Sequence, residues 1–291
     1  MQSQILELPS GTLELLIQGE GDELLVYHHG TPGAGRLPDD LVAEASAQGF
    51  RIAQVVRPGY GQSTRQPGRT VADVVPLVAA TADALGHDRF ASVGWSGGGP
   101  HVLATAALLP DRCVGAICLA GVAPFNADGL DFLAGMGQDN IDEFGAAIAG
   151  ESELEQFLVG MRESMKEVTG PEIVDVIESL LPAVDQRFLV AGFGEVLATQ
   201  FRFSLVSGIW GWFEDSRAFV KDWGFDVSTI AVPTQVWQGS EDLMVPFGHG
   251  TWLSEHVGSA TVRLELGEGH LSIAAKAFAE GLPTLKTALA S

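Results

Sequence analysis

A serine flanked by glycines is the part of this sequence best suited to chemistry. Ser96 lies in the pentapeptide Gly94-Trp95-Ser96-Gly97-Gly98, which fits the pattern G-x-S-x-G. Residues 90–95 form an apolar run typical of a buried strand, and residues 101–109 have the pattern of a helix. A serine in a sharp strand-to-helix turn is held with its hydroxyl exposed, and glycines leave room for a substrate to approach. We therefore predict that Ser96 is a nucleophile.

A serine hydroxyl attacks only when a base removes its proton, and that base must be oriented by an acid. The order expected along the chain is serine, acid, histidine. His270 comes directly after the last predicted strand, so it is the predicted base. Two adjacent carboxylates, Glu241 and Asp242, follow the strand predicted at 233–238. We favour Asp242 as the acid and expect Glu241 to be solvated or to cap the next helix.

The oxyanion that forms when a serine attacks a carbonyl needs hydrogen-bond donors already in place. One donor is expected from the residue after the nucleophile, the backbone N–H of Gly97. The other is expected from the glycine-rich loop that begins at His29. Pro32 has no N–H, so Thr31 is the predicted second donor, with Gly33 as the alternative. We expect His29 to hold this loop rather than to act as a second base.

Composition and charge exclude several classes of function. The 291 residues are 46% hydrophobic and 18% charged, which predicts a sizeable folded core. The net charge of −21 disfavours binding to nucleic acid. No apolar run is long enough to span a bilayer and residues 1–10 do not resemble a signal peptide, so we predict a cytoplasmic protein without membrane insertion.

The cysteines and histidines give no support for a metal site. Cys113 and Cys118 lie in one apolar strand-like segment, where they are expected to be buried thiols rather than a disulfide. Neither C-x-x-C nor H-E-x-x-H occurs in the chain. We predict no metal and no cofactor, a small-molecule substrate as partner, and leave a homodimer open.

The order of elements predicts an α/β fold with a mostly parallel, twisted sheet and helices on both faces. An initial hairpin at 4–8 and 12–18 is followed by alternating strand and helix patterns. This alternation stops after residue 123, where only helical patterns occur up to about residue 225, and it then resumes. We therefore predict a core formed by residues 1–123 and 226–291, with a helical cap, 124–225, inserted after the sixth strand.

Five motifs along the chain resemble the α/β-hydrolase family in their order and residue types. They are His29-Gly30-Thr31-Pro32-Gly33, Arg57-Pro58-Gly59-Tyr60-Gly61-Gln62-Ser63, the turn at Ser96, Gly239-x-x-Asp242-x-x-Val245-Pro246, and Gly269-His270. The resemblance implies the fold, the Ser96–Asp242–His270 triad and a helical cap. It also argues against epoxide hydrolases and haloalkane dehalogenases of this fold, which carry aspartate at the turn. Haloperoxidases, which are perhydrolases, usually have an aromatic residue where Thr31 stands, and the turn also departs from that of proline iminopeptidase-like members.

The composition of the predicted cap indicates which class of substrate to expect. It holds 14 of the chain's 23 aromatic residues, and 18 Asp or Glu against 6 Lys or Arg. Aromatic side chains favour an apolar pocket, so the first hypothesis is a serine hydrolase that cleaves a small, neutral, hydrophobic ester or lactone through an acyl-enzyme. The acidic residues favour a second, an aminopeptidase that binds a free amine. A third is a binding protein that has kept a hydrolase fold without activity.

Overall fold

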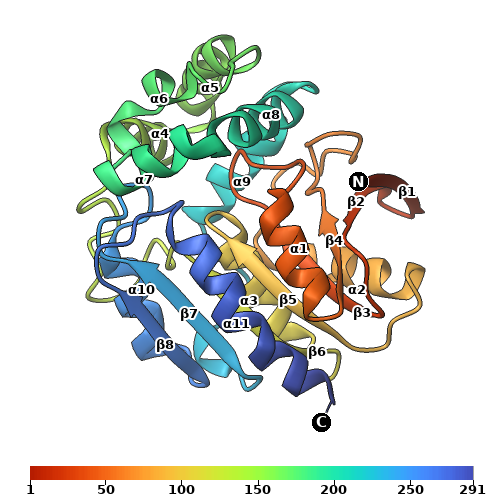
Figure 1. The fold of residues 1–291 in the computed structure, drawn as a ribbon. Helices are drawn as coiled ribbons and strands as arrows, with labels where there is room; N and C mark the ends of the chain where they lie inside the picture. The colour runs from red at the N-terminus through yellow and green to blue at the C-terminus, as the bar shows by residue number, and fades with distance from the viewer. Residues whose placement is uncertain (291) are drawn as a thin grey trace.

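Eight strands form one sheet in the computed structural model, which describes residues 1–290 (Figure 1). Their order across the sheet is β1-β2-β4-β3-β5-β6-β7-β8. The pairs β1–β2 and β2–β4 are antiparallel and all the others are parallel. The strands are β1 (Gln2–Leu8), β2 (Gly11–Gln18), β3 (Glu23–His28), β4 (Phe50–Val55), β5 (Phe90–Trp95), β6 (Cys113–Leu119), β7 (Thr234–Gly239) and β8 (Ala260–Glu265). The predicted fold class and opening hairpin are confirmed.

Helices cover both faces of this sheet. Leu25 and Tyr27 of β3 pack in one apolar cluster with α1 (Asp39–Ala47) and α11 (Ile273–Ala290). The alternate residues Leu24 and Val26 pack in a second cluster with α2 (Val75–Ala84), α3 (Gly98–Leu108) and α10 (Phe247–His256). Because side chains of a strand alternate between faces, a strand buried on both needs a continuous apolar run. This is why the central strands could be located from the sequence.

Helices alone fill the long interval between β6 and β7. They gather beyond one end of the sheet, drawn in green and cyan in Figure 1. The main ones are α4 (Gln138–Ala149), α5 (Glu151–Met165), α6 (Ile173–Val176), α7 (Ala183–Phe188), α8 (Gly194–Leu205) and α9 (Trp210–Phe219). We call residues 124–225 the cap, and their standing as a separate domain stays a prediction. A 3-10 turn, η2 (Glu178–Leu180), follows α6.

Pro76 begins a helix rather than bending one. A 3-10 turn, η1 (Ala72–Val74), is followed by α2, which has Pro76 in its first turn. The first N–H groups of a helix have no partner within it, so a residue that lacks an N–H is accommodated there without loss.

Two histidines outside the predicted triad are buried. His249 is buried because residues that follow β6 cover α10. Its Nδ1 accepts the N–H of Ala123 and its Nε2 lies 2.9 Å from the carbonyl oxygen of Phe132. His28 is fully buried, with its Nε2 3.2 Å from the Thr105 hydroxyl.

Both cysteines of β6 are buried free thiols, as predicted. Burial raises the pKa of Cys113 and of Cys118 to about 12, so neither is a reactive thiolate at neutral pH. Within residues 1–290 no cluster of three or more His, Cys, Asp and Glu side chains could hold a metal ion. None of the helices described there is long and apolar enough to cross a membrane.

Candidate active site

Ser96 stands at the turn between β5 and α3 in a left-handed backbone conformation, with φ of +58°. A non-glycine residue rarely adopts this conformation, which costs about 1–3 kcal/mol and is typical of functional turns. The neighbouring glycines make the turn sterically feasible. A Cβ at Gly94 would lie 2.2 Å from the carbonyl oxygen of Gly98, and one at Gly98 would lie 2.0 Å from that of His28. The chain therefore tolerates a strained serine where two strands and a helix meet.

His270 and Asp242 are paired beside this turn. The imidazole Nδ1 lies 2.8 Å from Oδ2 of Asp242, and both side chains are almost completely buried. The other oxygen of Asp242 accepts the N–H groups of Met244 and Val245, both at 2.8 Å, and Gln238 donates to Oδ2. An Asp242 carboxylate held in this way accepts a hydrogen bond from Nδ1–H, which leaves Nε2 of the neutral ring as the basic atom.

The charge on this pair favours a protonated histidine. Burial by itself lowers the pKa of His270, but the charge of Asp242, its hydrogen bond and the charge of Asp185 outweigh burial and raise that pKa above its ordinary value. An imidazolium at this position is therefore stabilised, as a general base requires after it has taken a proton.

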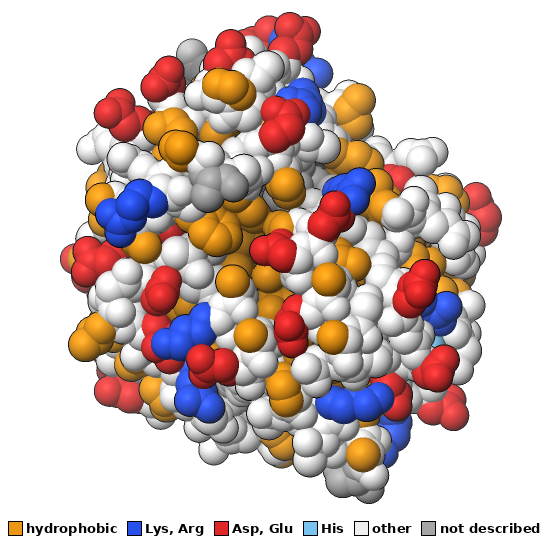
Figure 2. Space-filling model, viewed as in Figure 1, with side chains coloured by type: hydrophobic (Ala, Val, Ile, Leu, Met, Phe, Trp, Pro, Cys, Tyr) orange, Lys and Arg blue, Asp and Glu red, His pale blue; other side chains and the backbone are white. Residues whose placement is uncertain are grey.

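Ser96 and His270 line the same cavity, which measures about 890 Å³ including its open mouth. No hydrogen bond joins their side chains in the described part of the chain, and such contacts often tighten only when a substrate is bound. The wall is mainly apolar, and Figure 2 shows hydrophobic side chains gathered between the cap and the lower part of the molecule. The apolar lining residues include Trp95, Phe157, Met161, Met165, Ile177, Leu180, Phe193, Leu197, Phe201, Trp212, Met244 and Leu271.

Thr31 and Gly97 flank a smaller chamber that also reaches Ser96. A Cβ at Gly30 would lie 3.5 Å from the Cβ of Ser96, so the loop after β3 touches the serine. Within this loop, the backbones of Gly30 and Gly33 pair in an isolated antiparallel bridge. The sequence-predicted nucleophile, base, acid and both amide donors are thus close together at the carboxyl ends of the strands, where open α/β sheets bind ligands.

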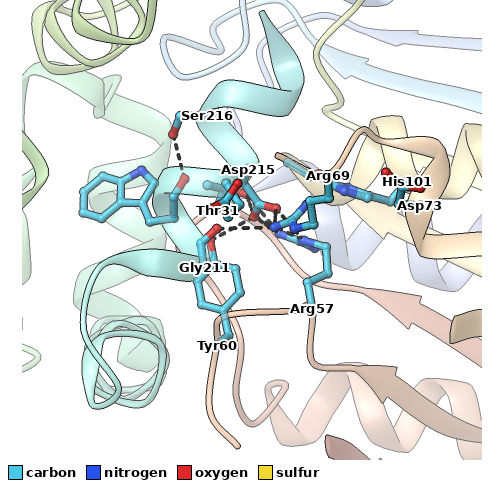
Figure 3. A network of polar contacts seen from close by, with 12 residues as sticks. Thr31, Arg57, Tyr60, Arg69, Asp73, His101, Gly211, Asp215 and Ser216 are labelled. Atoms are coloured by element: carbon cyan, nitrogen blue, oxygen red, sulfur yellow. Dashed lines mark hydrogen bonds and ion pairs between the residues drawn. The ribbon is translucent and has the colours of Figure 1, made fainter. Parts of the chain in front are cut away.

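A buried network of charged residues holds the loop that carries Thr31. Figure 3 shows Arg57, Arg69, Tyr60 and Thr31 converging on Asp215 of α9. The Thr31 hydroxyl donates to Oδ2 of Asp215 at 2.6 Å, Tyr60 donates to the same oxygen at 2.9 Å, and both guanidinium groups pair with the carboxylate. Burial raises the pKa of Asp215, but Arg57 and Arg69 outweigh it and hold that pKa well below its usual value.

Arg57 connects this network to the backbone of the loop. Its guanidinium donates to the carbonyl oxygens of His29 and Gly30, at 2.5 and 2.9 Å. The ring of His29 accepts the N–H of Arg57 through Nε2, while its Nδ1 lies 2.7 Å from the carbonyl oxygen of Gly30. His29 therefore holds the loop, as predicted. Asp215 was not predicted, although a buried arginine in the motif after β4 implies an acidic partner.

Glu143 of α4 places a carboxyl group in the wall of both cavities, which sequence reasoning also missed. Its Oε1 accepts hydrogen bonds from the indole of Trp212, at 2.8 Å, and from the hydroxyl of Ser216, at 2.7 Å. Burial raises the pKa of Glu143 to about 7, against these two hydrogen bonds, which lower it. Nothing in the sequence distinguishes it from the 17 other acidic residues of the cap. Among the described residues that line the larger cavity, none is Lys or Arg.

Comparisons with known proteins agree with this architecture. Residues 23–144 match the family described as alpha/beta hydrolase fold. The chain is 28% identical over 102 residues to an uncharacterized hydrolase, YcgS, of Bacillus subtilis, and 30% identical over 100 residues to a putative non-heme haloperoxidase of Mycobacterium phage D29. These matches cover 35% and 34% of the chain, and the chain spans only about a third of the length of these relatives (35% and 36%).

Solved structures match over almost the whole chain. An esterase from Thermogutta terrifontis has a TM-score of 0.70 at 18% identity, and a bromoperoxidase from Bacillus anthracis has one of 0.67 at 20% identity. Each alignment covers 98% of this chain and 100% of the other. The order of the strands and the likeness to these solved structures show an α/β-hydrolase fold, and residues 23–144 match the family of that name.

Proposed function

We propose that this protein is a serine hydrolase that cleaves small, neutral, hydrophobic esters or lactones. The observation that carries the proposal is the strained turn at Ser96, which opens onto the same cavity as the buried His270–Asp242 pair. Strain at a turn is costly and is retained where it presents a reacting group. A serine, an oriented imidazole and a buried carboxylate are the parts that acyl transfer requires.

In the proposed reaction, Oγ of Ser96 attacks the carbonyl carbon while Nε2 of His270 takes the hydroxyl proton. The negative charge moves to the carbonyl oxygen, where the N–H groups of Thr31 and Gly97 donate hydrogen bonds. As the carbon–oxygen bond to the leaving alkoxide breaks, His270 returns the proton to it, and an acyl-Ser96 ester remains. Water, deprotonated by His270, then releases the acid and restores Ser96.

The lining of the cavity supports the proposed class of substrate. Apolar side chains from α5, η2, α8, α9 and the core favour a hydrophobic acyl or alcohol group. The carboxyl groups of Asp139 and Glu143, without a lysine or arginine on the described wall, disfavour an anionic substrate. A neutral ester of modest size fits both conditions.

Short p-nitrophenyl esters test this proposal. We expect the wild-type protein to hydrolyse them, Ser96→Ala to lose at least about 10³-fold in kcat, and a fluorophosphonate probe to label only the wild type. Ser240→Ala, which changes a half-buried serine in the acid loop, is the matched control. Equal rates for wild type and Ser96→Ala would exclude the proposal, and an unlabelled wild type would favour a non-catalytic binding protein.

A second candidate, an aminopeptidase, is favoured by Glu143 alone. Oε1 is occupied by two donors from α9, and no bond is made by Oε2 in the described structure, so Oε2 can receive a substrate ammonium. This candidate predicts cleavage of an aminoacyl aryl amide with a free amine but not of its N-blocked form. It also predicts that KM for the free amine falls as pH rises through about 7, where Glu143 ionises, and that Glu143→Gln raises KM about tenfold and removes this pH dependence. Equal cleavage of free and blocked substrates would exclude it.

A further inference from the structure

Asp185 of α7 accepts hydrogen bonds from three consecutive backbone N–H groups at the site. Its Oδ2 lies 2.7 Å from the N–H nitrogen of His270, and its Oδ1 lies 3.1 and 2.9 Å from those of Leu271 and Ser272. The side chain is fully buried. These N–H groups directly precede α11, which begins at Ile273. Such donors have no partner within the helix and are usually satisfied by a neighbouring residue, whereas here the acceptor comes from the cap, 85 residues earlier.

The core leaves space for this carboxylate at one glycine. A Cβ at Gly269 would lie 2.5 Å from both oxygens of Asp185, closer than any real contact. The backbone of Gly269 does not have a positive φ, so the absence of a side chain serves the approach of Asp185 and not a turn. The carboxylate of Asp185 therefore occupies the space that a side chain at residue 269 would fill.

Burying a carboxylate at this position costs free energy. Within residues 1–290 no lysine or arginine pairs with Asp185. Burial raises its pKa, and the backbone N–H of Ser272, the charge of His270 and the N–H of Leu271 offset that increase only in part. A buried charge without a basic partner needs a reason beyond stability.

We propose that Asp185 is a positioning residue for His270, through which the cap holds the general base in place and stabilises its protonated form. The carboxylate fixes the peptide that bears the imidazole, and so fixes where Nε2 points. Asp242, from the loop after β7, and Asp185, from α7, are the two charged groups that act on this ring, and both favour the imidazolium. The kinetic part of this inference rests on the proposed function, whereas the geometric part does not.

The test compares Asp185→Asn with Asp175→Asn, which alters an exposed acid of the neighbouring α6. We expect Asp185→Asn to lower kcat on a p-nitrophenyl ester about 10- to 100-fold with KM changed less than twofold, because a small misplacement of a catalytic group is costly. The acid limb of the kcat/KM profile moves to lower pH, because loss of a negative charge destabilises the imidazolium. A purely structural role would lower the melting temperature and leave that limb in place.

An NMR titration of the His270 ring, in Ser96→Ala protein with and without Asp185→Asn, separates this proposal from the proposed function. If the wild type is neither labelled nor active, the hydrolase proposal fails, but the titration still tests Asp185. Gly269→Ala, which pushes the carboxylate away while keeping its charge, gives a second perturbation and is expected to lower kcat as well. An unchanged titration together with an unchanged kcat in Asp185→Asn would overturn the inference.

Discussion

Of the four buried carboxyl groups of the cap, three have clearly different sets of neighbours. Asp215 is paired with two arginines, Asp185 faces backbone N–H groups, and Glu143 meets only an indole and a hydroxyl. The pKa of Asp215 is accordingly lowered, while those of Asp185 and Glu143 are raised by burial. The chemical role of an acid therefore follows from its partners, not from its residue type.

The raised pKa of Glu143 predicts how stability depends on pH. Below its ordinary pKa of 4.5 the carboxyl is protonated in both states, so ionisation costs nothing. As pH rises, the unfolded chain ionises first, and the cost to the folded state is complete above pH 7, where we expect it to be about 3 kcal/mol. Glu143→Gln keeps an oxygen acceptor and avoids this cost.

Urea unfolding at pH 5 and pH 8 measures this effect. We expect Glu143→Gln to gain in free energy of unfolding over the wild type at pH 8 and to gain little at pH 5. Glu155→Gln, an exposed acid of α5, is the control and is expected to change stability by less than about 0.5 kcal/mol at both pH values. A gain that is the same at both would contradict the raised pKa.

Sequence patterns predicted Ser96, Asp242 and His270 as site residues because each lies in a short motif at the end of a strand. They also pointed to Thr31 and Gly97 as neighbours of those motifs. Short sequence motifs cannot identify Asp185, because its hydrogen-bond partners lie 85 to 87 residues further along the chain. Only the path of the cap brings α7 to the loop of His270.

At the scale of elements, α9 joins the cap to the core through Asp215. Arg57 follows β4, Arg69 precedes α2, and Thr31 lies after β3, so one carboxylate links three core loops. The sequence predicted the strands and most helices because their apolar periods are local. It could not predict this link, since Arg57 and Asp215 are 158 residues apart.

Removal of Asp215 is expected to be severe. Asp215→Ala leaves two buried guanidinium groups without their counterion, and we expect a loss of about 3–5 kcal/mol in the free energy of unfolding. Urea denaturation measures the loss, with Glu155→Ala as a control in the same cap. A loss below about 1 kcal/mol would show that the arginines find other partners, and the network would then be dispensable.

At the scale of the whole molecule, the sheet and the cap meet around the cavity. The parallel sheet, its hairpin and the interval without strands follow from composition and alternation, so the overall fold was accessible from the sequence. The residues with which the cap lines the cavity could not be predicted, because the sequence does not indicate which of the cap's 14 aromatic and 18 acidic residues face inward. Glu143 faces inward, whereas Glu155 faces solvent.

The two cap aspartates have a consequence for exchange of parts between relatives. Asp215 neutralises arginines that belong to the core, and Asp185 fills a gap that the core leaves beside Gly269. A chimera that joined this core to a foreign cap would inherit two unpaired buried cations and three N–H groups without acceptors. Cap and core are thus expected to be inherited together, and a cap that replaces this one must supply carboxylates in the places of Asp185 and Asp215.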